Sequence, residues 1–189
     1  MVVLITGANG QLGQAIQSIV GNHPSIDFVF CSSLDLDITN SANCETIFKQ
    51  YKPHFCINTA AYTAVDKAES EPDVAEAVNH LALKAIGEEA EKLSAVVIHY
   101  STDYVFDGKK KTPYTEEDTT RPLNIYGASK LKGEKYVQEI CQSYYILRTS
   151  WLYSQYGQNF YNTVLRFSKE RKPLTVTTEQ TGTPTNAND

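Results

Sequence analysis

The chain has 189 residues, of which 17 are Lys or Arg and 22 are Asp or Glu, so its formal net charge is −5. A chain of this length can bury a sizeable core, and we expect one domain, or one domain with part of another. The mildly acidic balance, without a run rich in Lys and Arg, argues against nucleic acid and anionic membranes as partners.

The N-terminus and the cysteines indicate the cellular setting. The opening MVVLITGANG is only a short apolar stretch with no basic residue before it. It is neither a secretory signal nor a membrane span, so we expect a soluble, cytoplasmic protein. The four cysteines lack a CxxC spacing, and Cys31 and Cys56 lie within apolar runs. We therefore expect reduced, buried thiols rather than disulfides or a zinc site.

Short apolar runs alternate with helical patterns along most of the chain. Because the runs lack a clean polar alternation, they indicate strands covered on both faces. The predicted strands are residues 2–6, 28–32, 55–59, 96–101 and 144–149, and the predicted helices are residues 13–20, 44–51, 73–93 and 128–141. This order predicts an α/β fold, a Rossmann-type doubly wound parallel sheet with right-handed crossovers and helices on both faces.

Two segments depart from the alternation. Residues 107–124 are polar and aperiodic and contain two prolines, which predicts a long loop, and loops of that length are usually functional. After residue 151 a helical pattern covers residues 161–169, and an extended, threonine-rich tail follows. We expect residues 1–150 to form an NAD(P)-binding domain with the catalytic groups, and residues 151–189 to begin a substrate-binding region that the chain does not complete.

A glycine-rich turn joins the first predicted strand to the first predicted helix. Gly7, Gly10 and Gly13 have the spacing G-x-x-G-x-x-G. The first glycine allows a tight turn, the second lets the backbone approach a pyrophosphate, and the third lets the helix pack on the strand. With a strand before it and a helix after it, the turn predicts dinucleotide binding, although such turns also serve as simple connections.

The identity of the dinucleotide depends on the end of the second predicted strand, where an acidic residue for a ribose hydroxyl is expected about 20 residues after the turn. The chain offers Cys31, Ser32 and Ser33 there, and Asp35 and Asp37 follow. With no carboxylate at the strand end to repel a 2′-phosphate, and with serine hydroxyls to donate to it, NADPH fits at least as well as NADH. A turn that caps the next helix is the alternative interpretation of the aspartates.

Tyr126 and Lys130 lie four residues apart at the entrance to a predicted helix, so their side chains share one face. A positive charge beside a phenol lowers its pKa from about 10 toward the working range, and Tyr126 would then be a general acid for a ketone. Thr102 ends the fourth predicted strand, where its hydroxyl can stabilise a developing alkoxide. A surface pair is the alternative for the tyrosine and lysine taken alone.

Together these motifs resemble the dTDP-4-dehydrorhamnose reductases, a family of extended short-chain dehydrogenases/reductases. The resemblance runs along almost the whole chain through TGANGQLG, INTAAYTAVDKAE, YSTDYVFDG, PLNIYGASKLKGE and RTSWLY. The glycine turn and the YxxxK pair are shared across the superfamily, whereas the other stretches are more specific. The resemblance implies NADPH- or NADH-dependent reduction of the 4-keto group of dTDP-4-dehydro-6-deoxy-L-mannose to dTDP-L-rhamnose.

The resemblance also implies roles for single residues. Its catalytic triad falls on Thr102, Tyr126 and Lys130, with Tyr126 giving a proton to the C4 oxygen while hydride arrives from the nicotinamide. Its cofactor contacts fall on Gly7, Gly10, Gln11, Leu12, Gly13, Asp37, Ile38, Ala60, Ala61, Thr63, Tyr126 and Lys130. Its contacts to the dTDP-sugar substrate fall on Thr102, Asp103, Tyr104 and Trp151. The alanines and the aromatic residues among them also suit simple packing.

Alternative functions and the assembly remain open at this point. Asp103 beside a strand-end hydroxyl also fits an extended short-chain sugar-nucleotide epimerase or dehydratase. A non-catalytic NADP-binding regulatory subunit, like that of methionine adenosyltransferase, would bind cofactor without turnover, and the intact triad argues against it. The resemblance is compatible with a homodimer. No metal is expected, because the helix after the glycine turn reads Gln14-Ala15-Ile16-Gln17, without the glutamate that holds Mg²⁺ in some members.

Overall fold

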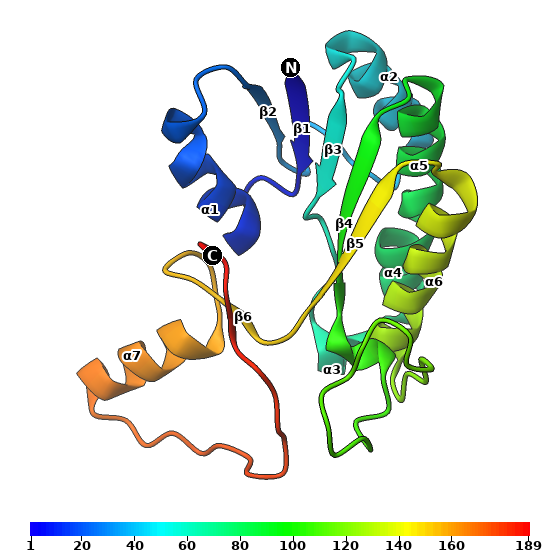
Figure 1. Cartoon of the computed structure of the whole chain (residues 1–189). Helices are drawn as coiled ribbons and strands as arrows, with labels where there is room; N and C mark the ends of the chain where they lie inside the picture. The colour runs from blue at the N-terminus through cyan, green and yellow to red at the C-terminus, as the bar shows by residue number, and fades with distance from the viewer.

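A five-stranded parallel sheet forms the centre of the molecule in this computed structural model, which describes all 189 residues. Its strand order is β2-β1-β3-β4-β5 (Figure 1). The strands are β1 (Val2–Thr6), β2 (Asp27–Cys31), β3 (Phe55–Asn58), β4 (Val96–Thr102) and β5 (Tyr144–Thr149). Each lies within one residue of its predicted bounds, and the predicted Rossmann-type fold is confirmed. The strand order reverses between β1 and β3, which is where ligands bind in such sheets.

Helices cover the two faces of the sheet unequally. The helices are α1 (Gln11–Ile19), α2 (Ser41–Tyr51), α3 (Val65–Ala68), α4 (Pro72–Glu76), α5 (Ala82–Lys92), α6 (Ile125–Ile140) and α7 (Phe160–Glu170). Figure 1 shows α1 alone on one face and α2, α5 and α6 on the other. Consequently β1 is buried, whereas Tyr145 and Leu147 of β5 are exposed. The expectation that every strand is covered on both faces is wrong for β5.

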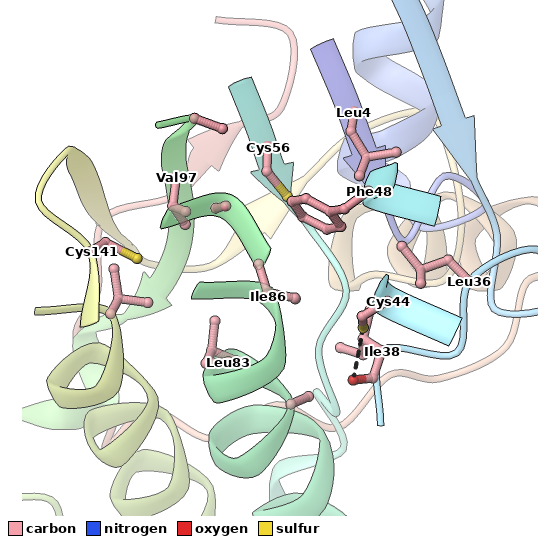
Figure 2. Close-up of a cluster of buried hydrophobic side chains, with 14 of the residues drawn as sticks. Leu4, Leu36, Ile38, Cys44, Phe48, Cys56, Leu83, Ile86, Val97 and Cys141 are labelled. Atoms are coloured by element: carbon pink, nitrogen blue, oxygen red, sulfur yellow. Dashed lines mark hydrogen bonds between the residues drawn. The ribbon is translucent and has the colours of Figure 1, made fainter. Parts of the chain in front are cut away.

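The hydrophobic core lies between the sheet and the α2–α5–α6 face. Figure 2 shows Phe48 of α2 beside Leu4 and Cys56 of the sheet, and Ile86 of α5 belongs to the same buried cluster. All four cysteines are buried and free, so the predicted burial of the thiols is confirmed. Burial raises the pKa of the Cys44 and Cys141 thiols to about 11, which keeps them protonated near neutral pH.

A π-helical turn interrupts the helix predicted for residues 73–93. α4 ends at Glu76, the π turn η2 covers Ala77–Leu81, and α5 begins at Ala82. Within this turn Asn79 is buried, its Oδ1 accepting from the Tyr62 N–H at 2.9 Å and its Nδ2 donating to the Ser129 hydroxyl at 3.1 Å. Apolar periodicity cannot reveal such a turn, because it adds only one residue to an otherwise helical pattern. The turn ties the loop after β3 to α6.

The chain beyond β5 forms a small unit beside the carboxyl ends of the strands (Figure 1). Two short strands, β6 (Leu152–Tyr153) and β7 (Thr185–Asn186), pair in parallel, and α7 lies between them in sequence. The sequence predicts the helix but not strands of two residues. Residues 107–124 contain neither helix nor strand, as predicted. No helix has both the length and the hydropathy needed to span a bilayer.

The approach of α6 to the π turn is close enough to test by substitution. A Cβ on Gly133 would overlap the carbonyl oxygen of Asn79, whereas a Cβ on Gly21 would meet no atom within 4 Å. We expect Gly133→Ala to lower the free energy of unfolding by about 2 kcal/mol, as overpacked sites do, and Gly21→Ala to leave it nearly unchanged. Urea unfolding followed by circular dichroism measures both. Equal stability of the two variants would contradict the packing described.

Candidate active site

An open cavity lies at the carboxyl ends of the strands, with a volume of ≈ 1370 Å³. That exceeds the range of about 300–1,000 Å³ typical of a site for one small molecule. Its walls come from the glycine turn, the loop after β3, the end of β4, the first turns of α6, and the unit formed by residues 151–189. The cavity therefore has room for two ligands that meet end to end.

The glycine turn has the backbone geometry that its spacing predicts. Gly7 has φ +64°, and a Cβ there would lie 2.7 Å from the Ala60 nitrogen. A Cβ on Gly13 would lie 2.6 Å from the Gly7 carbonyl oxygen, so only glycine lets α1 start this close to β1. Gly10 lines the cavity, while Gly7 and Gly13 lie behind it. Gly7 and Gly13 therefore determine the shape of the turn, and Gly10 is the glycine that a ligand in the cavity can contact.

The N-terminus of α1 has no side-chain cap, unlike those of α2, α6 and α7. Asn40, Asn124 and Asn159 cap α2, α6 and α7 by accepting hydrogen bonds from backbone N–H groups. No side chain caps α1, whose Ncap position is Gly10. The first-turn N–H groups and the positive end of the helix dipole therefore remain available to an anion in the cavity. This arrangement fits a dinucleotide pyrophosphate.

Gln11 joins the turn to the C-terminal unit, a role that the sequence does not reveal. Its Nε2 donates to the Leu152 carbonyl at 3.0 Å, and its Oε1 accepts from the Ser154 hydroxyl at 3.3 Å and from Asn159 Nδ2 at 3.1 Å. Its partners lie more than 140 residues away in sequence. With the side chain engaged, the backbone of Gln11 is what remains for the predicted cofactor contact.

A carboxylate lies beside the end of β2, although no acidic residue occupies that position in the sequence. Asp35 folds back, and its Oδ2 accepts from the Ser32 N–H at 2.9 Å and from the Ser32 hydroxyl at 2.6 Å. The hydroxyl bond and then the N–H bond lower the pKa of Asp35, which is ionised at neutral pH. The Ser32 hydroxyl hydrogen is thus already committed. The expectation that no carboxylate lies at this strand end is wrong, whereas donation by the serine hydroxyls to a 2′-phosphate stays a prediction. Asn40 rather than Asp35 caps α2.

Several predicted cofactor residues do not line the cavity. Ile38 is buried in the core, where Cys44 Sγ lies 3.6 Å from its carbonyl oxygen (Figure 2). Asp37 accepts hydrogen bonds from the N–H and hydroxyl of Thr39. Ala60 packs against the core, whereas Ala61 and Thr63 line the cavity. The cofactor roles of Asp37, Ile38 and Ala60 stay predictions.

Thr102, Asp103 and Tyr126 lie together at one wall of the cavity. Asp103 accepts from the Thr102 hydroxyl at 3.2 Å and, through its other oxygen, from the Ser150 hydroxyl at 2.9 Å. Burial raises the pKa of Tyr126, and the nearby Thr102 hydroxyl partly offsets that rise. The expectation that Lys130 lowers the phenol's pKa is not met in this structure. A phenol with a raised pKa retains its proton and can donate it.

Lys130 is almost completely buried beneath the same wall. Its Nζ donates to the Tyr100 carbonyl at 2.6 Å and lies 3.4 Å from His99 Nε2. Burial lowers the pKa of Lys130 to about 8, against an opposing contribution from Glu134. Glu134 is itself held by Arg148 through two hydrogen bonds of 2.9 and 2.6 Å. The pKa of Lys130 is therefore lower than that of an exposed lysine, although Glu134 opposes the shift.

The cavity is also lined by residues that the sequence analysis does not predict as site residues. Tyr100, Ser101 and Thr149 lie at the ends of β4 and β5. The hydroxyl of Ser101 is buried and has no hydrogen-bond partner, so it is free to bind a ligand group. Their position beside Thr102 at the strand ends was the one signal available in the sequence. No group of three or more His, Cys, Asp or Glu side chains is arranged to hold a metal ion.

The predicted substrate residues Tyr104 and Trp151 also line the cavity. Tyr104 packs edge-on against Tyr126, with ring centroids 5.7 Å apart. Trp151 has φ +47°, an uncommon conformation for a bulky residue, and its ring covers Gly182, where a Cβ would lie 2.7 Å from the indole. Strained backbone of this kind is most frequent at ligand sites.

Comparison with known proteins gives the family. The family model described as RmlD substrate binding domain matches residues 1–189. The chain belongs to this family. It is 45% identical over 190 residues to the dTDP-4-dehydrorhamnose reductase of Shigella flexneri, which covers 99% of this chain and 63% of that protein. The chain thus spans less than two thirds of the length of this relative. The family resemblance drawn from the motifs is confirmed.

Solved structures agree with this assignment. A dTDP-4-dehydrorhamnose reductase from Bacillus anthracis in complex with NADP has a TM-score of 0.95 and 41% identity, covering 98% of this chain and 66% of that one. A UDP-glucose 4-epimerase from Thermus thermophilus in complex with NAD has a TM-score of 0.83 at 18% identity, covering 100% of this chain and 71% of that one. The second likeness shows the shared fold alone.

The lowered pKa of Lys130 has a consequence for stability. Because the folded state loses this proton near pH 8 and the unfolded state near 10.5, the unfolded state binds more protons between these values. The free energy of unfolding should therefore rise with pH across this window, by about 1 to 3 kcal/mol relative to a Lys130→Met variant. Chemical denaturation of both proteins from pH 7 to 10.5 measures this difference. Parallel pH profiles would contradict it.

The carboxylate of Asp35 bears on the choice of cofactor. If the adenosine ribose lies at the end of β2, as in other dinucleotide-binding folds, Asp35→Asn should improve NADPH binding relative to NADH several-fold, because a negative charge beside the 2′-position is removed. Asp27→Asn removes an equal charge at the opposite end of β2 and serves as the control. Fluorescence titrations with both cofactors give the ratio. An unchanged ratio in Asp35→Asn would place the ribose elsewhere.

Proposed function

We propose that the full-length protein reduces the 4-keto group of dTDP-4-dehydro-6-deoxy-L-mannose with NADPH or NADH and releases dTDP-L-rhamnose. One observation carries this proposal. A buried lysine, a proton-bearing tyrosine and a strand-end threonine lie on one wall of a cavity whose other end is an uncapped helix N-terminus. The relatives named as dTDP-4-dehydrorhamnose reductases, one of them solved with NADP, support it.

The cofactor is proposed to bind along the carboxyl ends of β1 and β3. Its pyrophosphate would lie at Gly10, Gln11 and Leu12, where α1 is uncapped. The loop after β3, with Ala61 and Thr63, would contact the middle of the cofactor. When bound, the nicotinamide supplies the hydride. Lys130 is proposed to bind the nicotinamide ribose, because its Nζ keeps hydrogens beyond the one given to Tyr100.

The triad residues are proposed to act on the C4 oxygen of the sugar. Tyr126 donates its phenolic proton to that oxygen, and its raised pKa keeps the proton in place until the oxygen becomes basic. Thr102 orients the carbonyl through its hydroxyl, which also interacts with Tyr126. Asp103, Tyr104 and Trp151 line the same part of the cavity and are proposed to bind the dTDP-sugar.

We further propose a division of labour along the chain and a setting for it. Residues 1–150 would bind the cofactor and carry the triad, and residues 151–189 would contribute one side of the sugar site, since their segment closes the cavity opposite the strands. Four free, buried thiols suit a reducing compartment such as the cytoplasm. A homodimer is proposed on the family resemblance alone.

The alternative functions have less support from the site. A dehydratase needs a carboxylic acid that can donate a proton, yet both oxygens of Asp103 accept hydrogen bonds from hydroxyls, which suits a carboxylate. A regulatory subunit has no need for a buried lysine with a lowered pKa. Reduction by hydride with Tyr126 as the acid uses every group at this wall.

A Tyr126→Phe variant of the full-length protein tests the proposal. We expect turnover to fall by about 10²- to 10⁴-fold, as when a general acid is removed, with NADPH binding retained. The assay follows loss of reduced-cofactor absorbance with dTDP-4-dehydro-6-deoxy-L-mannose and identifies the sugar product. Tyr136→Phe is the matched control, since Tyr136 lies on the same helix against His80. If the wild-type protein oxidises neither NADPH nor NADH with this sugar, the proposed function is wrong.

A further inference from the structure

A buried row of polar side chains runs beneath the site, from Thr6 of β1 to Lys130 of α6. The Thr6 hydroxyl lies 2.5 Å from Asn58 Oδ1, and Asn58 Nδ2 lies 3.0 Å from His99 Nδ1. His99 Nε2 in turn lies 3.4 Å from Lys130 Nζ. All four residues are almost completely buried, on β1, β3, β4 and α6. The proposed reaction uses Lys130 but assigns nothing to His99.

The direction of hydrogen bonding along this row is fixed at its Thr6 end. The Thr6 oxygen accepts from the Ala60 N–H at 3.3 Å, so its own hydrogen is free to point at Asn58 Oδ1. The amide of Asn58 then presents Nδ2–H to His99, whose Nδ1 must accept. A neutral imidazole that accepts at Nδ1 carries its hydrogen at Nε2. That hydrogen points toward Lys130.

His99 is neutral in this environment. Complete burial, together with the nearby charge of Lys130, lowers the pKa of His99 well below its ordinary value. An Nε2–H and an ammonium are both donors, so no hydrogen bond can form between them while Lys130 is charged. The two nitrogens accordingly lie 3.4 Å apart, whereas Lys130 Nζ lies 2.6 Å from its acceptor, the Tyr100 carbonyl.

We propose that His99 is a positioning residue that, held by Asn58 as the Nε2–H tautomer, stabilises the neutral amine of Lys130 by donating a hydrogen bond that the ammonium cannot accept. His99 contacts neither substrate nor cofactor in this role and acts only through Lys130. The effect adds to burial, which already favours the neutral amine.

Other charged groups around Lys130 do not replace this contribution. Glu134, one turn along α6, favours the ammonium, but Arg148 of β5 neutralises it through paired hydrogen bonds. Asp103 and Tyr126 face the cavity side, where Asp103 acts on the phenol of Tyr126. From β4, Tyr100 offers its carbonyl, and from β3 Asn58 reaches only His99. His99 is thus the polar side chain that contacts Lys130 Nζ on its buried side.

A consequence for turnover rests on the proposed function. After Tyr126 has given its proton to the sugar oxygen, the phenolate must regain one. Lys130 can supply it, breaking an N–H bond as the phenol O–H forms, and then regain a proton from water in the cavity. A hydrogen bond from His99 to the resulting amine favours the transfer of the proton from Lys130 to the phenolate.

The first test is the tautomer itself, measured on the ¹⁵N-histidine-labelled full-length protein by two-bond ¹H–¹⁵N spectra. The chain contains four histidines, and a His99→Gln variant assigns the resonances of His99. We expect a neutral ring with hydrogen on Nε2 and none on Nδ1. A hydrogen on Nδ1, alone or with one on Nε2, would overturn the proposal. This measurement does not require the protein to reduce any sugar, so its failure is separable from failure of the proposed function.

The second test reverses the tautomer. Thr6→Val removes the hydroxyl that orients Asn58, so the amide can turn and offer Oδ1 to a hydrogen on Nδ1, leaving Nε2 to accept from the ammonium. We expect the protonation constant of Lys130, followed through its ¹³Cε shift in ¹³C-lysine-labelled protein, to rise about 3- to 10-fold. Thr46→Val is the matched control, because Thr46 is exposed and its hydroxyl bonds only to the Ala42 carbonyl of its own helix.

The second test has defined contrary outcomes. A reversed tautomer in Thr6→Val with an unchanged Lys130 titration would show that His99 does not influence Lys130 and would overturn the proposal. A shift of Lys130 equal to that in Thr46→Val would do the same. Should Thr6→Val fail to fold, the tautomer in the wild-type protein still decides whether the Nε2–H faces Lys130.

Discussion

The burial of one ammonium group between β4 and α6 is the constraint around which the rest of the site is arranged. An isolated charge is costly to bury, so Lys130 requires the Tyr100 carbonyl as an acceptor and a lowered pKa. The same burial obliges Glu134 to pair with Arg148 rather than remain a lone carboxylate. Strand β5 therefore supports the triad through Arg148 although it carries no triad residue.

The position of Lys130 depends in turn on how closely α6 approaches its neighbours. Gly133 lies against the Asn79 carbonyl of the π turn, and Gly127 lies against the Tyr104 carbonyl at the end of β4. Asn79 also bonds to Ser129, the residue before Lys130. The helix is thus fixed at two points, one between Tyr126 and Lys130 and one at Gly133, beyond Lys130. Small residues on α6 allow this close approach to its neighbours, which larger side chains would prevent.

Local patterns in the sequence predict the strands, most of the helices and the glycine turn, because each depends on residues close together in the chain. Gly7 and Gly13 behave as their spacing indicates. The pairing of Gln11 with Ser154 and Asn159 and the network from Thr6 to His99 depend on the tertiary fold, so no local pattern reveals them. Asp35 is an intermediate case. Its hydrogen bond to Ser32 spans only three residues, but a search for a carboxylate at the last residue of the strand does not find it. His99 looks like an ordinary strand residue until its neighbours are known.

The triad is therefore the easier part of the site to predict, and its support is the harder part. Tyr126 and Lys130 lie on one helix, whereas the side chains beside Tyr126 and the carbonyl that binds Lys130 come from β4 and the residues that follow it. Burial, together with the nearby Asp103 and Tyr104, raises the pKa of Tyr126 where the sequence predicts that it is lowered. A motif identifies the reacting groups, but their acidity follows from what encloses them.

The row of polar side chains under α6 also affects how the chain tolerates mutation. Asn58, His99, Lys130 and Glu134 occupy positions that apolar residues could fill, and buried polar and charged groups of this kind add little net stability. The apolar cluster around Phe48, on the far side of the same helical layer, must therefore supply more of the folding free energy. Conservative substitutions there would lower the amount of folded protein in a cell while leaving the activity of each folded molecule intact. Loss-of-function variants far from the cavity are to be sought first in that cluster.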